Sequence, residues 1–145
     1  MEKCSFILLI DINAVLRYPW VMTPEELSER LWQFAARVGK VVDALPDTRL
    51  GRHVAGQLVR CGTSGPPNYD EGCAAESRAD FIHKVGIALK ELKETTGWLR
   101  FVIIAGLLPQ RRIDLLRSEG IELLKILARS ILTAKANRRK RPPGV

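Results

Sequence analysis

The longest apolar pattern of the chain lies in residues 77–105, which read SRADFIHKVGIALKELKETTGWLRFVIIA. Its main seam repeats at alternating steps of four and three residues, on Phe81, Val85, Ala88, Leu92, Thr95, Leu99 and Val102. A spacing near 3.5 residues predicts an amphipathic helix of roughly 40 Å that packs against other helices. A second stripe runs beside the first, on Ile82, Leu89, Thr96 and Ile103. Since one bundle seam needs a narrower face, we expect part of this surface to contact a second copy of the chain.

Capping residues mark the ends of this helix and of an earlier one. Ser77 is a typical N-cap residue, and Gly106 is a typical stop signal. Upstream, Thr23 is followed by Pro24 and by Glu26, which together give an N-cap, a proline in the first turn and a capping box. The sequence therefore predicts helices over about 24–45 and about 78–105.

Two further helices complete the predicted fold. Asp47 can cap a second helix that stops near Ser64 and presents one apolar face of Leu50, Val54, Leu58 and Cys61. Pro109 opens a fourth helix, which reaches about Lys135 and carries Ile113, Leu116, Leu123, Leu127 and Ile131. Four helices with short connections, and no competing strand pattern, predict an all-α, antiparallel, up-and-down four-helix bundle over residues 22–136.

One segment argues against continuous helix. Residues 65–72 read GPPNYDEG, and neither Pro66 nor Pro67 offers a backbone N–H. Pro67 also disfavours the helical conformation at the residue before it. We expect a kink or short break here.

The two ends of the chain fall outside the predicted bundle. Residues 1–21 match no period and contain Tyr18-Pro19-Trp20, so they are interpreted either as an upstream extension ahead of a start at Met22 or as a weakly ordered strand or turn. Residues 137–145 form a basic tail with Arg138, Arg139, Lys140 and Arg141, and end in a Pro-Pro-Gly-Val sequence. We expect this tail to be disordered.

Composition fits one globular domain. The 145 residues are 46% hydrophobic and 27% charged, and the formal net charge is +7. Cys4, Cys61 and Cys73 are odd in number and widely spaced, which favours a reducing cytoplasm over a disulfide framework. The apolar run near the start is too short for a membrane span, and Glu2 spoils a signal peptide.

The central motif resembles a known family. Residues 58–72, LVRCGTSGPPNYDEG, are followed by SRADFIHKVGIALKE at 77–91, by Glu94-Thr95 with Trp98-Leu99, and by AGLLP at 105–109. These residues resemble the bacterial four helix bundle proteins, also called 23S ribosomal RNA intervening-sequence proteins. The resemblance implies a bundle that assembles as a homopentamer, has no established catalytic activity, and is encoded within insertions in ribosomal RNA genes. A related branch resembles the basic accessory proteins of diversity-generating retroelements, which associate with a reverse transcriptase and nucleic acid.

The polar signature of that family falls on Asn68, Tyr69, Glu71 and Gly72. A structural role is the leading interpretation: Asn68 would cap the turn after the break, and Glu71 would accept hydrogen bonds from freed backbone N–H groups. The alternative is a polar pocket for a ligand or RNA. Two features depart from the family: the consecutive prolines, and the segment 1–21.

Basic residues supply the candidate nucleic-acid contacts. Arg49, Arg52 and Arg60 lie on the second predicted helix, and Arg138, Arg139, Lys140 and Arg141 lie in the tail. In a ring of identical subunits, weak phosphate contacts repeat and become strong together. The three tryptophans do not predict a base-stacking platform: Trp32 and Trp98 are expected to pack within the bundle or between subunits, and Trp20 lies in the N-terminal extension.

No catalytic, metal or cofactor site is predicted. Asp80 and His83 give only half of a di-iron motif, and His53 has Leu50 where the acid would stand. Cys61 falls on an apolar stripe, and no glycine-rich phosphate loop is present in the sequence. The leading hypothesis is a non-enzymatic RNA-associated scaffold, and the alternative is a protein-interaction module or accessory subunit that docks a partner such as a reverse transcriptase.

Overall fold

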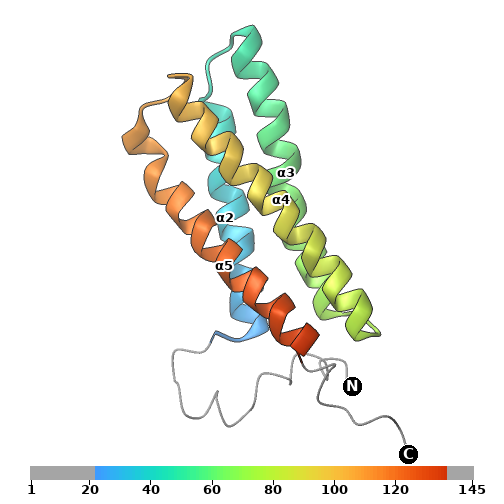
Figure 1. The fold of residues 1–145 in the computed structure, drawn as a ribbon. Helices are drawn as coiled ribbons and strands as arrows, with labels where there is room; N and C mark the ends of the chain where they lie inside the picture. The colour runs from blue at the N-terminus through green and yellow to red at the C-terminus, as the bar shows by residue number, and fades with distance from the viewer. Residues whose placement is uncertain (1–21, 137–145) are drawn as a thin grey trace, which may run out of the picture.

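The computed structural model describes residues 22–136, and these form four long antiparallel helices with no strand among them (Figure 1). The elements are α2 (Pro24–Ala44), α3 (Arg49–Cys73), α4 (Arg78–Ile104), a short 3₁₀ turn η2 (Gln110–Arg112) and α5 (Asp114–Ala136). Each helix runs opposite to the one before it, joined by a short connection. The predicted all-α up-and-down bundle is confirmed. The extension 1–21 and the tail 137–145 lie outside the described residues.

The predicted start of α2 is confirmed in atomic detail. The Glu26 backbone N–H donates to Thr23 Oγ1 at 3.1 Å, while the Thr23 N–H donates to Glu26 Oε2 at 2.7 Å. This reciprocal pair satisfies two donors that the first turn of a helix cannot satisfy itself. Ser77 caps α4 in the predicted way, with its hydroxyl accepting from the Asp80 N–H.

The expected break at the two prolines is wrong, because α3 continues as helix through Pro66 and Pro67 to Cys73. Gly65 has no Cβ to meet the ring of Pro66, which eases the restriction at position 65, but the restriction that Pro67 places on Pro66 remains and has to be outweighed by packing. Continued helix also places Pro66 and Tyr69 in the buried interior. This burial stabilises a backbone that local preference alone would interrupt.

Hydroxyl and amide side chains flank the prolines. Thr63 Oγ1 and Ser64 Oγ each donate to the carbonyl four residues earlier, and Asn68 Nδ2 donates to the Ser64 carbonyl at 2.8 Å. Asn68 thus bonds to the turn before it, inside a helix, and does not cap a resumed one. Side-chain bonds of this kind to helix carbonyls are common where the ladder is disturbed.

Two other predicted boundaries need correction. Thr48, not Asp47, caps α3, with Thr48 Oγ1 accepting from the Gly51 N–H at 3.0 Å. The fourth helix starts at Asp114 and not at Pro109, since Pro109 opens η2. Gly106 ends the α4 turn with a φ of +66°, a conformation that glycine adopts without a Cβ penalty.

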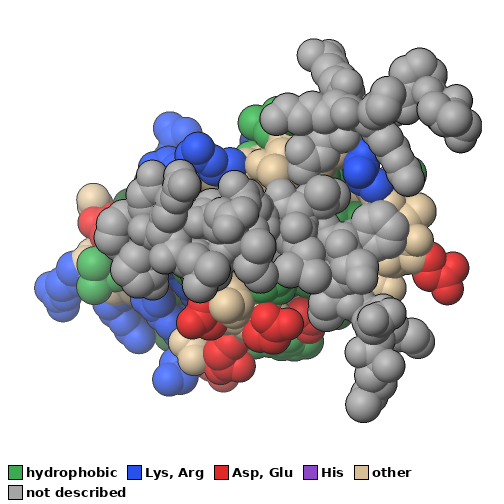
Figure 2. Space-filling view, turned by 90° about the horizontal axis from the view of Figure 1, so that it is seen from below, with side chains coloured by type: hydrophobic (Ala, Val, Ile, Leu, Met, Phe, Trp, Pro, Cys, Tyr) green, Lys and Arg blue, Asp and Glu red, His purple; other side chains and the backbone are tan. Residues whose placement is uncertain are grey.

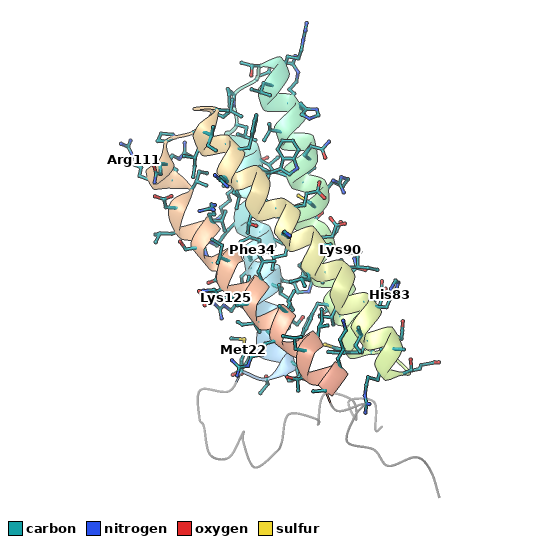
Figure 3. All side chains as sticks on the ribbon, viewed as in Figure 1. Met22, Phe34, His83, Lys90, Arg111 and Lys125 are labelled. Atoms are coloured by element: carbon teal, nitrogen blue, oxygen red, sulfur yellow. The ribbon has the colours of Figure 1, made fainter. Side chains whose placement is uncertain are left out.

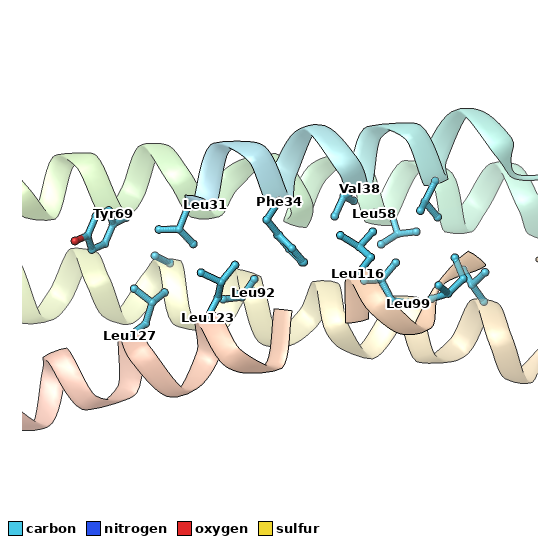
Figure 4. Packing of buried hydrophobic residues seen from close by; sticks show 14 of the residues in the cluster. Leu31, Phe34, Val38, Leu58, Tyr69, Leu92, Leu99, Leu116, Leu123 and Leu127 are labelled. Carbon is cyan, nitrogen blue, oxygen red and sulfur yellow. The ribbon is translucent and has the colours of Figure 1, made fainter. Parts of the chain in front are cut away.

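The core is a continuous file of apolar side chains between the four helices (Figure 4). The main seam of α4 is buried from Val85 to Val102. Phe81 is only partly buried at its start. The α3 seam is buried from Val54 onward, but Leu50 is 44% exposed and does not belong to it.

Small residues let the helix backbones approach closely at three points. A Cβ on Gly62 would lie 2.6 Å from Val38 Cγ1 of α2. A Cβ on Gly72 would lie 2.9 Å from Val85 Cγ2 of α4, and one on Gly120 would lie 2.6 Å from a Thr96 methyl. These are contacts that no larger residue could make without displacing a core side chain.

Among the neighbouring helix pairs, α2 and α5 pack least closely, and an ion pair links them. Arg30 binds Glu119 through two hydrogen bonds, from Nε at 2.5 Å and from Nη2 at 2.8 Å. The bonds to Arg30 hold the pKa of the Glu119 carboxyl below its usual value, and the same pair raises the pKa of Arg30. This two-point contact fixes the side of the bundle where apolar packing is thinnest.

Candidate nucleic-acid interface

One end of the bundle carries an excess of cations. It is formed by the end of α2, the start of α3, the end of α4 and η2. Within residues 40–53 and 100–114 the cations are Lys40, Arg49, Arg52, Arg100, Arg111 and Arg112, and the anions are Asp43, Asp47 and Asp114. All six cations are exposed. We call this group the basic end.

The opposite end of the bundle is weakly acidic. Residues 22–29, 70–84 and 125–136 contain seven acids, Glu25, Glu26, Glu29, Asp70, Glu71, Glu76 and Asp80, against five cations, Arg78, Lys84, Lys125, Arg129 and Lys135. Figure 3 shows Arg111 at one end of the bundle and Met22 at the other. Viewed along the bundle in Figure 2, basic side chains gather mainly on one side, and a group of acidic side chains lies along an edge. An elongated anion such as RNA would therefore meet the two ends differently.

The predicted cluster of Arg49, Arg52 and Arg60 is divided by the structure. Arg49 and Arg52 lie in the first turn of α3 at the basic end. Arg60 lies lower on α3 and forms an ion pair with Glu94 of α4, with Glu91 Oε2 also 3.8 Å from its Nη1. Arg60 therefore links two helices, and its guanidinium is less available to bind a phosphate than those of Arg49 and Arg52.

The remaining ion pair at this end is weak. Arg52 Nη1 lies 2.6 Å from Asp47 Oδ1, but the two side chains are 64% and 90% exposed. Water screens such pairs, so Arg52 can exchange Asp47 for another anion at little cost. The predicted tail residues Arg138, Arg139, Lys140 and Arg141 lie outside the described residues. Helix α5 ends at the acidic end of the bundle.

The family signature residues lie at the junction of α3 with its neighbours. Tyr69 is buried, and burial is the main cause that raises its pKa above the usual value. Glu71 accepts a hydrogen bond from Lys84 Nζ of α4 at 2.5 Å and does not accept from freed backbone groups. This bond raises the pKa of Lys84. Gly72 allows α3 to approach α4 closely, and Asn68 donates a hydrogen bond to the Ser64 carbonyl.

Asp70 stands between two signature residues, and its role could not be predicted from the sequence. Its carboxylate accepts from Ser28 Oγ at 2.5 Å and from Trp32 Nε1 at 2.9 Å, both on α2. The only signal was the i, i+4 spacing of Ser28 and Trp32, which places them on one helix face without naming a partner. Together with Glu71, Asp70 makes this stretch of α3 a junction to α2 and α4.

A second feature absent from the predictions is an aromatic cluster between α3 and α4. The ring of Trp98 meets His53 edge-on at a centroid distance of 5.9 Å, and meets Phe101 edge-on at 5.6 Å. His53 is exposed, and Phe101 is 36% exposed. The cluster therefore reaches solvent just below the basic end.

The sequence and structure comparisons agree on one family. A model of the 23S rRNA-intervening sequence protein family matches residues 26–129, which cover α2, α3, α4 and most of α5. The chain belongs to this family. The solved structures include a protein of unknown function from the S23 ribosomal protein family of Bacteroides thetaiotaomicron. It is 31% identical to this chain, covers 72% of it and 97% of its own length, and superimposes with a TM-score of 0.68. A comparison with curated proteins found no match.

Within the described residues, this intervening-sequence family member has no candidate metal cluster and no candidate membrane-spanning helix. Among residues 22–136, no group of three or more His, Cys, Asp and Glu side chains could hold a metal ion. No helix in the same range is long and apolar enough to cross a bilayer. Cys61 is buried beside Thr95, and burial raises the pKa of its thiol. A protonated, enclosed thiol is a poor nucleophile.

Proposed function

We propose that this protein is a non-enzymatic, oligomeric scaffold of the bacterial cytoplasm that associates with structured RNA through the basic end of its bundle. One observation carries the proposal: six exposed cations and only three acids gather at one end of the bundle, while acids outnumber cations at the other end. Membership of a family named for the 23S rRNA intervening sequence supports RNA as the ligand.

The physical basis is counterion release. Each arginine or lysine that neutralises a phosphate frees a condensed cation, so affinity falls steeply as salt rises. A single basic end makes few contacts and binds weakly. In an assembly of identical subunits the contacts repeat around the ring. Once one subunit has bound an RNA, the other sites meet it at a high effective concentration, so the affinity of the assembly exceeds that of one subunit.

Exposed apolar side chains support assembly. Leu115 and Leu132 of α5 are 79% and 66% exposed, and Ile104 of α4 is 70% exposed. Large aliphatic side chains gain about 1.5–3 kcal/mol each when they leave water, which favours contact between copies. The family resemblance gives a homopentamer as the expected assembly. Light scattering on the purified chain measures this directly, and a monomer at micromolar concentration would contradict it.

The RNA proposal is tested by titrating a 23S rRNA fragment with the protein at several salt concentrations. The test variant replaces Arg49, Arg111 and Arg112 by Gln. The control variant replaces Lys90 and Arg129 by Gln, two exposed cations away from the basic end. We expect the test variant to lower the slope of log K against log salt by about 2–3, since each lost phosphate contact removes about 0.7–0.9. Failure of the wild-type chain to bind at low salt would end the proposal.

The second candidate is a protein-interaction module or accessory subunit, such as one that docks a reverse transcriptase. The same exposed leucines and Ile104 favour it, because they suit a protein partner as well as a second copy. Affinity capture before and after nuclease treatment separates the two functions. A partner lost with nuclease supports RNA bridging, and a partner that stays bound supports direct docking.

A further inference from the structure

We propose that the face between α3 and α4, just below the basic end, holds unpaired nucleotides of the bound RNA. Their bases would stack on the rings of Phe101 and His53 around Trp98, and their phosphates would contact Arg49 and Arg100. This proposal rests on the proposed RNA association and names the RNA feature that the protein selects.

The rings are held in place and stay accessible. Trp98 packs partly against the core, and its Nε1 donates to Glu94 Oε1 at 3.4 Å. The rings of His53 and Phe101 stand at 72° and 83° to the Trp98 plane. An edge-to-face arrangement leaves at least one face of each outer ring uncovered by Trp98, and both outer side chains are exposed. Nucleobases stack on such faces whatever their sequence, because every base presents a π-surface.

Open space lies beside these rings. A Cβ built on Gly56 of α3 or on Gly97 of α4 would meet nothing within 4 Å. The contacts of His53 with Trp98, and of Arg60 with Glu94, place the two glycines at the same level of the α3–α4 pair. Glycine in the middle of a helix is unfavourable unless something approaches it closely. We call this open surface over Gly56 and Gly97 the strip, and it allows a nucleotide backbone to lie against the helices.

The charges around this strip suit an anion. From α3 they are Arg49, Arg52 and Arg60, and from α4 they are Glu91, Lys93, Glu94 and Arg100. Arg60 pairs with Glu94 and approaches Glu91, and Arg52 contacts Asp47, so these two cations offset two of the three acids. Arg49, Lys93 and Arg100 form no ion pair within the described residues, so the balance is positive.

Net charge favours RNA over a second copy as the occupant. The chain carries +7, and a copy placed on a positive strip would be repelled. RNA supplies phosphates for the arginines and bases for the rings. Bases in a duplex are covered by their neighbours and pairs, whereas bases in loops and bulges are free to stack on aromatic side chains.

The test compares two RNAs of equal length. One is a hairpin with a six-nucleotide loop, and the other is a blunt duplex with the same number of phosphates. Fluorescence of Trp98 is followed in a chain whose Trp20 and Trp32 are replaced by Phe. We expect the hairpin to bind about 5-fold or more tightly than the duplex, as stacking of one base predicts, and to quench Trp98.

Two variants test whether the preference for the hairpin arises at the strip. Phe101→Leu keeps apolar area but removes the ring, and Gly97→Leu fills the empty space while leaving every ring in place. Both should remove the preference for the hairpin and leave duplex affinity unchanged. In the control, position 32 carries Leu in place of the Phe of the test chain, since Trp32 is an aromatic position 45% exposed on α2.

Each outcome separates this inference from the function it rests on. Equal binding of hairpin and duplex by the wild-type chain would overturn the stacking site and leave RNA association standing. No binding of either RNA would overturn both. A change in assembly mass in Phe101→Leu, without a hairpin preference in wild type, would show that a second copy occupies the strip and would overturn the inference.

Discussion

The close approach of α2 and α3 at Gly62 can be measured by pairing Gly62→Ala with Gly97→Ala. Both glycines lie inside helices, so both substitutions gain about 0.5–1 kcal/mol from the better helix propensity of alanine. At Gly97 a new Cβ meets nothing within 4 Å, and the gain should appear in full.

At Gly62 the same methyl group meets the core. It would lie 2.6 Å from Val38 Cγ1 and 3.3 Å from Val38 Cβ. Val38 is 1% exposed, and its branched side chain is stiff at χ1, so it cannot move aside without disturbing its neighbours. Overpacking of this kind costs about 1–3 kcal/mol. The propensity gain is common to both variants, so their difference in stability isolates the overpacking cost.

Urea unfolding followed by circular dichroism at 222 nm gives both values, with protein concentration held fixed because assembly shifts apparent stability. We expect Gly97→Ala to unfold at higher urea than wild type and Gly62→Ala at lower urea, with equal slopes. In heat, each 1 kcal/mol corresponds to about 2–8 °C in Tm. If the two variants gained stability equally, α2 and α3 would not approach at Gly62 as described.

Three further predictions concern the core, one ion pair and one thiol. Leu92→Asp should abolish cooperative thermal unfolding, because it buries an unpaired charge in a seam position that is 4% exposed, and a retained cooperative transition would mean that the register of α4 is wrong. Glu119→Gln should lower the free energy of unfolding by about 1 kcal/mol at pH 7. Because Arg30 lowers the pKa of Glu119, this difference between the variant and wild type should be present above the unfolded pKa near 4.5 and should vanish as the pH falls through the folded pKa. A difference in urea unfolding that did not change with pH would contradict the ion pair. Iodoacetamide should alkylate Cys61 only after denaturation, as read by peptide mass mapping, and native-state modification at the rate of a free thiol would show that the site is open.

The four helices, and the starts of α2 and α4, can be predicted from the sequence because their causes are local. The Thr23 capping box and the Ser77 cap involve residues three positions apart, so the chain itself specifies them. The apolar seams are equally local, since their spacing alone places one face inward.

The errors arise where tertiary contacts outweigh local preference. Pro66 and Pro67 would break an isolated helix, but Tyr69 and Gly72 gain buried contacts only if α3 continues. Leu50 has the right spacing for the seam, yet it lies in the first turn of α3 and stays 44% exposed.

The candidate site was less predictable than the fold. Arg49 and Arg52 could be picked from charge alone, but the pairing of Arg60 with Glu94 depends on how α3 and α4 align. The same alignment creates the ring cluster around Trp98 and the bonds of Asp70 to α2. Sequence spacing within one helix carries no information on such partners.

The most direct test of the central claim, that RNA meets the basic end, is site-specific photo-crosslinking at two exposed positions. A benzophenone amino acid replaces Leu50 at the basic end in one protein and Ala79 at the acidic end in another. With structured RNA bound, we predict crosslinks from position 50 and few from position 79. Equal crosslinking from both positions, or a preference for position 79, would contradict the account.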